Sequence, residues 1–269
     1  MPRIAIIGCG AIAAEMLACL DARGLSGAVA CVLARSHRVE SLGGKLGTTP
    51  LVDGNGALLA CHPDIVVECA GHEAVRTYGG LVLESGIDLI IASVGALADD
   101  MLAAALARAS ASGGRVLIPS GAVAGIDGLL AARTAGLAKV SYTSVKPPRA
   151  WKGTPAETLL ALDDLTGPRG FFEGSAREAG LQYPKNANVG ATIALATLGF
   201  DQTRVRLVAD PAATGPRGLI EAEGAFGAFR FETFARASPL NPKTSLLTAH
   251  SLLLAAERGW AFEPTLSCP

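Results

Sequence analysis

The sequence predicts an α/β fold with two lobes: an N-terminal doubly wound parallel sheet, and a second α+β lobe with a mixed or antiparallel sheet. Up to about residue 120, short β-branched runs alternate with longer helical stretches rich in Ala and Leu. The first β-branched run leads directly into a glycine-rich turn and a helix. Beyond this point the alternation stops, and short helices are mixed with strands of alternating apolar and polar residues.

The first lobe is predicted from buried strands that are separated by helices. We expect strands at 3–7, 28–34, 64–69, 87–92 and 115–118. The intervening helices are expected at 11–22, 54–60, 74–85 and 98–112. Because helices connect successive strands, the connections are right-handed βαβ units and the strands lie parallel in one sheet.

The second lobe is predicted from a change of rhythm after residue 120. A helix at 126–135 leads into a strand at 139–145, a stiff proline turn and a short helix near 156–163. Strands at 204–209, 219–223 and 228–234 follow, and we expect them to be antiparallel. A last helix at 244–258, stopped by Gly259, is expected to pack back on the first lobe. The expected divisions are therefore 1–120, 121–240 and 241–269.

Composition favours a small ligand over nucleic acid or a membrane. The 269 residues carry a formal net charge of -1, so no basic field attracts polyanions. Mean hydropathy is +0.38, but polar residues, Gly and Pro interrupt every apolar stretch before the roughly 18–20 residues of a membrane span. The cysteines lie in hydrophobic segments or at the C-terminal tail without a C-x-x-C pair, which predicts a reducing cytoplasm and no metal site. They are Cys9, Cys19, Cys31, Cys61, Cys69 and Cys268.

A glycine turn, Gly8-Cys9-Gly10-Ala11-Ile12-Ala13, joins the first strand to the first helix. The first glycine permits the tight turn, the second lets the backbone approach a pyrophosphate, and the small Ala13 allows close packing of helix on strand. The pyrophosphate would then lie on the helix N-terminus. The motif alone is weak, but a strand before it and a helix after it are the context that it requires. We therefore expect a Rossmann site for NAD or NADP. Its turn contacts are Gly8, Gly10, Ala11, Ile12 and Ala13.

The end of the second strand bears on the choice between NAD and NADP. About 20 residues beyond the glycines, NAD sites offer Asp or Glu to the ribose. Here the loop reads Arg35-Ser36-His37-Arg38. Arg35 and Arg38, with Ser36 as a donor, are suited to a 2′-phosphate, so we expect NADP to be accepted. The alternative is that these cations belong to a solvated loop.

Later strand ends are expected to border the cofactor as well. The strand at 64–69 is followed by Ala70-Gly71-His72, and we expect Ala70 to contact the cofactor. His72 either faces the nicotinamide or begins the next helix, and the second alternative is preferred. Small residues at 93–96 and 120–125 leave room for a flat ring near the backbone.

Three polar clusters in the second lobe each combine a proline, a lysine and hydrogen-bond donors near an expected helix start. They are Lys146-Pro147-Pro148-Arg149, Tyr183-Pro184-Lys185-Asn186-Ala187-Asn188 and Asn241-Pro242-Lys243-Thr244-Ser245. One such cluster is ordinarily a capped surface turn. Helix N-termini and ammonium groups both favour anions, so the three together indicate a carboxylate site. The expected substrate-binding residues are Lys146, Lys185, Asn186, Lys243 and Thr244.

With these motifs, the chain resembles the L-aspartate dehydrogenase family of bacteria and archaea over essentially its whole length. The resemblance rests on 8–13, 120–128, 172–176, 183–189 and 241–245. It implies a Rossmann lobe, a catalytic and dimerisation lobe, and a cytoplasmic homodimer. It also implies that L-aspartate is interconverted with oxaloacetate and ammonia through iminosuccinate, with NAD or NADP, and that iminosuccinate can feed NAD biosynthesis. By position, Ala122 and Asn188 correspond to the family's contacts beside the nicotinamide.

The chain departs from the family at its catalytic histidine. In the family this residue lies in an N-x-H-x-I stretch shortly before a Gly-x-Phe-Gly segment. The corresponding residue here is Gly218, ahead of Gly224-Ala225-Phe226-Gly227, and no histidine lies between His72 and His250. Lys146, Lys185 or His72 could substitute for it, the substrate could differ, or the histidine could have been replaced by design.

The missing histidine affects one half of the expected chemistry more than the other. Adding water to an imine and releasing ammonia need a proton donor and acceptor, which contributes about 10²–10⁴-fold. Hydride transfer depends mainly on the cofactor and on orientation. Such a chain could reduce a preformed imine while deaminating aspartate poorly.

Three functions remain open on the sequence. The first is an aspartate-dehydrogenase-like oxidoreductase of CH–NH2 donors, with Lys146, Lys185 and Lys243 holding the carboxylates of a small amino or imino dicarboxylate. The second is an imine or semialdehyde reductase related to dihydrodipicolinate reductase or homoserine dehydrogenase, with Arg217 in a remodelled pocket. The third is a catalytically weak NADP(H)-binding protein. The polar clusters favour the first function, and Gly218 favours the third.

Overall fold

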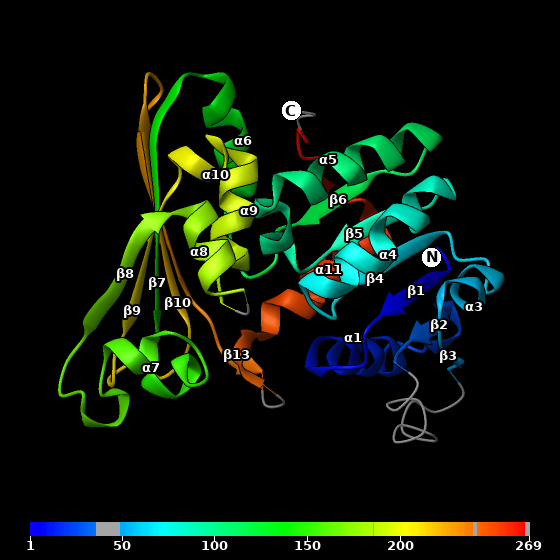
Figure 1. Ribbon diagram of the computed structural model, residues 1–269, viewed down its shortest axis with the longest axis horizontal. Helices are drawn as coiled ribbons and strands as arrows, with labels where there is room; N and C mark the ends of the chain where they lie inside the picture. Colours follow the sequence, from blue (N-terminus) through cyan, green and yellow to red (C-terminus); the bar gives the residue numbers. More distant parts are fainter. Residues whose placement is uncertain (36–48, 185, 239–240, 267–269) are drawn as a thin grey trace. The chain divides into compact units, whose positions relative to one another are not determined.

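Figure 1 shows the computed structural model of the chain, which describes residues 1–35, 49–184, 186–238 and 241–266. The chain divides into two compact units. The first comprises Met1–Pro119 and Thr248–Pro269, and the second comprises Ser120–Leu247. The second boundary falls inside the last helix, α11 (Leu246–Arg258), whose first two residues belong to the second unit.

The first unit is built on a seven-stranded sheet of order β14-β6-β5-β4-β1-β2-β3. Its strands are β1 (Ile4–Ile7), β2 (Val29–Leu33), β3 (Leu51–Val52), β4 (Ile65–Glu68), β5 (Asp88–Ile91), β6 (Val116–Pro119) and β14 (Ala261–Phe262). The strands from β1 to β6 pair in parallel, and β14 adds to β6 in the antiparallel direction. All four residues of β1 are buried, as expected for a parallel strand covered on both faces. The predicted doubly wound parallel sheet is confirmed.

Helices cover this sheet and supply its core. They are α1 (Ala11–Ala22), α3 (Asn55–Ala60), α4 (His72–Glu84), α5 (Asp100–Ala109) and the later part of α11, with short 3-10 turns at Ser26–Ala28, Val94–Ala98 and Ser110–Ser112. Met16 and Leu20 of α1 share one buried cluster with Leu252 and Leu253 of α11. The C-terminal helix is therefore part of the first unit's core.

The helix expected at 98–112 is interrupted by a cap. The side chain of Asp99 accepts hydrogen bonds from the backbone N–H groups of Met101 and Leu102, at 3.0 and 3.2 Å. An aspartate that caps in this way starts a new helix, so α5 begins at Asp100 and the residues before it form a separate 3-10 turn. The two-residue strand β3 was not anticipated because it is too short to show a periodic pattern.

The second unit is built on a five-stranded sheet of order β11-β10-β7-β9-β8. Its strands are β7 (Leu137–Lys146), β8 (Arg169–Ser175), β9 (Arg204–Ala209), β10 (Arg217–Gly224) and β11 (Gly227–Phe234). The expectation that 204–209 is simply antiparallel is wrong, because β9 pairs with β7 in parallel and with β8 antiparallel. A parallel neighbour requires a long crossover, and residues 147–203 supply one. The sheet is mixed, within the class that the sequence predicted.

Helices of the second unit lie on one face of this sheet (Figure 1). They are α6 (Ile126–Thr134), α8 (Ala176–Gln182), α9 (Asn188–Ala196) and α10 (Gly199–Gln202). Outside this layer are α7 (Ala156–Leu159), 3-10 turns at Pro148–Trp151 and Leu162–Asp164, and the pair β12 (Ala237–Ser238) and β13 (Asn241–Ser245). Along β7, Val140, Tyr142, Ser144 and Lys146 are buried while the residues between them are not, so these four share the covered face.

Candidate functional site

A pocket of about 360 Å³ lies at the carboxyl ends of β1, β2 and β4 in the first unit. Gly8 and Gly10 line it from the glycine turn, Arg35 from the end of β2, and Ala70 and Glu73 from the end of β4 and the start of α4. Open α/β sheets bind their ligands in the crevice beyond the carboxyl ends of the strands. The pocket therefore lies where the sequence predicted a dinucleotide.

The glycine turn has the geometry that its motif requires. Gly8 has a φ of +115°, and a Cβ there would lie 2.9 Å from the Cβ of Ala70 and 3.1 Å from its backbone nitrogen. Any side chain at Gly8 would therefore collide with the turn after β4. A Cβ at Gly10 would meet no described atom within 4 Å, so the wall of the pocket is open there. Gly10 is also the N-cap of α1, where the orphan N–H groups of a helix favour a phosphate.

The small residues after the turn are placed as the motif predicts. Ala11 and Ile12 begin α1 and are half-buried, whereas Ala13 is 1% exposed and belongs to the core beneath the sheet. Arg35 is exposed at the edge of the pocket. Ser36 and Arg38 lie outside the described residues.

Glu68 is a buried carboxylate that the sequence analysis did not single out. It is the last residue of β4, and it is 0% exposed. Burial raises the pKa of Glu68, while hydrogen bonds from Gly71, Ala70 and Ser93 favour its charged form and lower that pKa. An acidic residue inside an otherwise apolar parallel strand is the sequence signal that could have identified it.

His72 is the first residue of α4, which agrees with the helix-start alternative. The residue is half-buried, its Nε2 atom is buried, and it is not among the described residues that line the pocket. His72 therefore lies between two pocket residues in the sequence, Ala70 and Glu73, without lining the pocket itself.

In the second unit, the structure brings together Lys146 and Asn186, which are 40 residues apart in the sequence. Lys146 is the last residue of β7 and is 8% exposed, and its Nζ donates to Oδ1 of Asn186 at 3.2 Å. The Nζ also lies 5.3 Å from the ring centroid of Trp151, within cation–π range. Asn186 is 6% exposed, and its Nδ2 has no hydrogen-bond partner among the described residues.

A buried ammonium and a buried amide N–H2 group together form a donor-rich site. Buried donors are normally satisfied, and a carboxylate offers acceptors on two oxygens. The pair at Lys146 and Asn186 therefore presents donors that suit an anion, and its role as a substrate site stays a prediction.

Aromatic packing explains how two distant segments meet at this pair. Trp151 is fully buried and donates from Nε1 to the carbonyl of Val208 at 3.1 Å. Phe171 of β8 contacts Trp151 and Tyr183, with ring centroids 4.8 and 5.8 Å away. The carbonyl of Tyr183 in turn accepts from the backbone N–H of Asn186 at 2.8 Å.

For the other residues predicted to contact the substrate or the nicotinamide, the structure gives the element in which each lies. Asn188 is the first residue of α9, and Ala122 lies in the loop before α6; both are half-buried. Thr244 lies in β13, so the third polar cluster is a strand that precedes a helix rather than a helix start. Lys185 lies outside the described residues, and for Lys243 only the backbone is described.

Gly218 lies in β10, opposite Ser144 of β7 and Thr233 of β11. This register places it on the same covered face as Tyr142 and Lys146. A Cβ at Gly218 would lie 3.0 Å from Oγ1 of Thr233, 3.1 Å from Cε2 of Tyr142 and 3.3 Å from its hydroxyl oxygen. Two hydroxyl groups therefore border the direction in which a side chain at 218 would point.

The phenol beside Gly218 does not titrate near neutral pH. Burial raises the pKa of Tyr142 to about 12, and a hydrogen bond from Ser144 opposes that shift. At neutral pH Tyr142 is therefore a neutral hydrogen-bonding group rather than a base.

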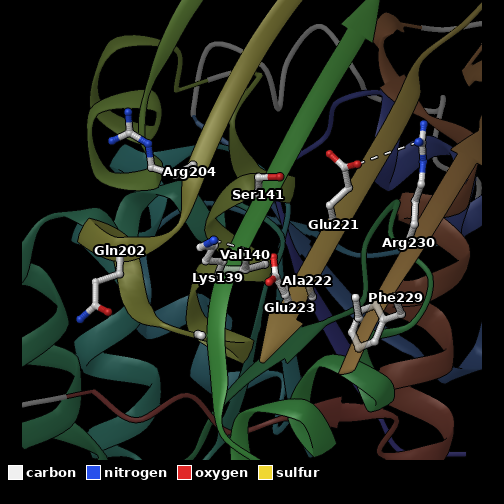
Figure 2. A pocket seen from close by; sticks show the side chains of 12 residues that line it. Lys139, Val140, Ser141, Gln202, Arg204, Glu221, Ala222, Glu223, Phe229 and Arg230 are labelled. Atoms are coloured by element: carbon white, nitrogen blue, oxygen red, sulfur yellow. Dashed lines mark ion pairs between the residues drawn. The ribbon is translucent and has the colours of Figure 1, made fainter. Parts of the chain in front are cut away.

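A second hollow, of about 660 Å³, lies on the other face of the same sheet (Figure 2). Ser141, Arg204, Glu221 and Arg230 project into it from four adjacent strands. Its charges are partly paired, since Glu221 lies 3.9 Å from Arg230, and Lys139 lies 3.8 Å from Glu223. None of the described residues predicted for substrate or cofactor lines it. We therefore do not assign the substrate to this hollow.

The described part of the chain was compared with what a membrane span and a metal site require. No helix there has the length and apolar character that crossing a membrane requires. No cluster of three or more His, Cys, Asp or Glu side chains there is arranged to hold a metal ion.

Comparison with known proteins gives matches for both units. The family model "Aspartate dehydrogenase, C-terminal" matches residues 127–258, and "Homoserine dehydrogenase, NAD binding domain" matches residues 8–119. The L-aspartate dehydrogenase of Ruegeria pomeroyi is 44% identical over 266 residues, covering 98% of this chain and 94% of that protein. The chain belongs to the L-aspartate dehydrogenase family. The corresponding enzyme of Pseudomonas aeruginosa is also 44% identical, over 95% of this chain and 96% of its own.

A solved structure supports the same assignment. The aspartate dehydrogenase of Thermotoga maritima superposes with a TM-score of 0.70 at 27% identity, over 95% of each chain. A hyperthermophilic archaeal homoserine dehydrogenase in complex with NADPH shares the fold, with a TM-score of 0.56 at 12% identity over 100% of this chain and 98% of its own. As a member of the aspartate dehydrogenase family with an NAD-binding domain, the chain is an NAD(P)-dependent oxidoreductase.

The aspartate dehydrogenase resemblance gives the geometry at Gly218 its meaning. The position that the resemblance assigns to the family's catalytic histidine lies on the face that carries Lys146. The buried Lys146–Asn186 pair and Gly218 therefore belong to the same unit, and the sequence offers no imidazole at position 218.

Proposed function

We propose that this chain is a dehydrogenase of L-aspartate, or of a closely similar amino dicarboxylate, that uses NAD or NADP. We further propose that it transfers hydride to and from the imine more effectively than it adds water or releases ammonia. The buried Lys146–Asn186 pair carries the first proposal, because its donors suit a substrate carboxylate. Gly218 carries the second.

For cofactor binding, the proposed contacts are those of the first-unit pocket. The open wall at Gly10 and the N-terminus of α1 would hold the pyrophosphate, with Ala11, Ile12 and Ala13 forming the first turn of the helix. Arg35 would pair with a 2′-phosphate, so NADP is accepted. When bound, the nicotinamide supplies hydride transfer, and Ala70, Ala122 and Asn188 are the proposed neighbours of the cofactor.

For substrate binding, Lys146 would bind one carboxylate through its ammonium and Asn186 through its Nδ2 group. Burial strengthens both interactions because the local dielectric is low. Lys185, Lys243 and Thr244 are proposed for the second carboxylate, since they belong to the same polar clusters in the sequence. Holding both carboxylates fixes the orientation of the carbon that gives up hydride.

Proton handling is the step for which this chain is poorly equipped. The Nζ of Lys146 donates a hydrogen bond to Asn186, and the phenol of Tyr142 stays neutral because burial raises its pKa to about 12. His72 and Lys185 remain the other proposed substitutes for the family's histidine. We therefore expect imine hydration and ammonia release to limit turnover.

One pair of assays tests both proposals. NADPH oxidation is measured with oxaloacetate and ammonia, and separately with iminosuccinate that is generated in place by an aspartate oxidase. We expect turnover in both assays, with a rate on the preformed imine that is higher by a factor on the order of 10². No turnover in either assay at high enzyme concentration, together with tight NADPH binding, would indicate a cofactor-binding protein instead.

A second candidate is an imine or semialdehyde reductase that acts on a different small substrate. The two hydroxyls of Tyr142 and Thr233 at Gly218 favour it, because they are hydrogen-bonding groups that do not act as a base at neutral pH. Screening amino acids as donors for NADP reduction separates the candidates. A substrate preferred over aspartate by about tenfold or more in kcat/KM would replace aspartate in the proposal.

We also propose that the protein is a cytoplasmic homodimer. The family resemblance supports this proposal, and the five cysteines that the structure describes are unpaired thiols, as in a reducing compartment. Light scattering after gel filtration tests the assembly, and a monomer mass at micromolar concentration would contradict it. Cell fractionation tests the location.

A further inference from the structure

Glu68 ties together two loops at the carboxyl edge of the first sheet. Its Oε1 accepts hydrogen bonds from the backbone N–H groups of Ala70 and Gly71, at 2.7 and 2.8 Å. Ser93, which follows β5, donates from its hydroxyl to Oε1 at 2.9 Å and from its backbone N–H to Oε2 at 3.0 Å. One carboxylate therefore fixes the turn after β4 and the residue after β5 at the same time.

The turn that Glu68 holds is also the surface on which the glycine turn rests. A Cβ at Gly8 would lie 2.9 Å from the Cβ of Ala70, so these two backbones are in close contact. Ala70, Gly8 and Gly10 all line the pocket of the first unit. A displacement of Ala70 would therefore change the width of the pocket and the support of the glycine turn together.

The chemistry of these contacts demands a carboxylate in particular. All four donors point at acceptor-only oxygens, and a carboxylate is the side-chain group that has two of them. A glutamine of the same shape would place an N–H2 group against the N–H of Ser93, or against those of Ala70 and Gly71. The N–H groups of one of the two loops would then lose their acceptor, and that loop would move away from residue 68.

We propose that Glu68 is a positioning residue for the dinucleotide: it holds Ala70 and Gly71 against the Gly8 turn, so that the pocket is formed before the cofactor arrives. Glu68 acts through the backbone of these residues and is itself buried away from the pocket. Preorganisation of this kind lowers the ordering cost of binding. The inference rests on the proposed use of this pocket by NAD(P).

The test replaces Glu68 by glutamine and measures the Kd of NADH and of NADPH by cofactor fluorescence, with steady-state kinetics beside it. We expect the Kd and the KM of both cofactors to rise by about tenfold or more, since at least one backbone N–H group of the two loops is left without its acceptor. The kcat at saturating cofactor and the KM of the second substrate should stay within about threefold. A loss of general stability would not produce this selective change.

A matched control separates positioning from stability. Asp88, at the start of β5 and at the opposite end of the strand, also accepts a backbone hydrogen bond, from Arg115 at 2.9 Å, and it also forms an ion pair with that residue. Asp88→Asn should lower the melting temperature without changing either cofactor Kd. Ser93→Ala removes one of the four donors to Glu68 and should raise the Kd by a smaller factor, about threefold. Glu68→Asp keeps two acceptor oxygens and should fall between the wild type and Glu68→Gln.

The outcomes distinguish this inference from the proposed function. A folded Glu68→Gln variant with wild-type cofactor Kd values would overturn the positioning role and leave the proposed function intact. If that variant does not fold, unchanged Kd values in both Glu68→Asp and Ser93→Ala would overturn it instead. A wild-type protein that binds neither NADH nor NADPH would refute the proposed function, and the positioning role with it.

Discussion

Gly8 in the first unit and Gly218 in the second are both glycines at functional positions, yet the chain requires only one of them. At Gly8 the φ of +115° and the backbone of Ala70 exclude any side chain. At Gly218 the φ lies outside the left-handed range, and the nearest atoms belong to the side chains of Thr233 and Tyr142. The first glycine is demanded by the backbone, whereas at the second a side chain would meet only other side chains. We therefore expect cofactor binding to depend on backbone shape, and proton chemistry to depend on the residue at one replaceable position.

The largest expected effect comes from the anion site on the face that carries Gly218. Lys146→Met removes the buried ammonium and leaves Oδ1 of Asn186 without its donor. We expect kcat/KM for the dicarboxylate to fall by about 10²–10³-fold, because a buried charged contact and its partner are both lost. Cofactor Kd should stay at the wild-type value. Lys152→Met is the matched control, since Lys152 is exposed and paired with Asp163; equal losses in both variants would contradict the site.

The second effect restores the missing side chain. Gly218→His should raise the rate with oxaloacetate and ammonia by about 10–10²-fold, less than a well-placed general base provides. The gain is limited because the new Cβ would lie 3.0 Å from Oγ1 of Thr233. Adding Thr233→Ala makes room, so the double variant should exceed the single one. The restored imidazole should also introduce a dependence on pH near its ordinary pKa of about 6.5.

One result would contradict the expected gain from a histidine at position 218. If neither variant gains activity, while both keep the wild-type cofactor Kd and activity on the preformed imine, then proton handling does not limit this chain. The second candidate function, with a different substrate, would become the better explanation.

The difference between local backbone demands and contacts between distant side chains also explains what the sequence could predict. The glycine turn and the strands around it are set by local backbone demands and burial patterns, and these are legible in short stretches such as 3–13. Two helices of the second unit, α8 and α9, were not predicted, for different reasons. Helix α9 is buried on nearly all sides and rich in small residues, so it shows no amphipathic period. The preceding helix α8 does carry a local signal in the sequence, the capping box formed by Ser175 and Glu178.

The functional residues follow the same division. Lys146 and Asn186 were predicted separately from polar clusters, and only the aromatic packing of Trp151, Phe171 and Tyr183 shows that they meet. Contacts across 40 residues have no signature in a single sequence. Glu68 was overlooked because its partners are backbone N–H groups, which every residue type can offer.

The third effect concerns the stability of the second unit at high pH. The pKa of Tyr142 is raised by burial from an unfolded value of about 10 to about 12. The folded chain therefore holds this proton more tightly than the unfolded chain does. The associated stability is complete below pH 10 and is lost as pH rises toward 12, by about 3 kcal/mol in total. Urea unfolding at pH 9 and pH 11 should show this loss in the wild type and a smaller one in Tyr142→Phe. An equal loss in both proteins would assign the alkaline effect to other groups.

The smallest expected effect is in the first unit. It tests whether the choice between NADH and NADPH depends on one side chain, as we expect proton chemistry to do in the second unit. Arg35 is exposed at the edge of the pocket, so water and salt screen its charge. Arg35→Ala should raise the KM of NADPH by about three- to tenfold and leave the KM of NADH unchanged, because only NADPH carries the 2′-phosphate. Arg3→Ala is a control for the loss of a surface arginine in the same unit, since Arg3 is bonded to carbonyls at 61 and 62. Equal changes for both cofactors would show that Arg35 supports the pocket generally. The first unit would then select dinucleotides by backbone shape alone.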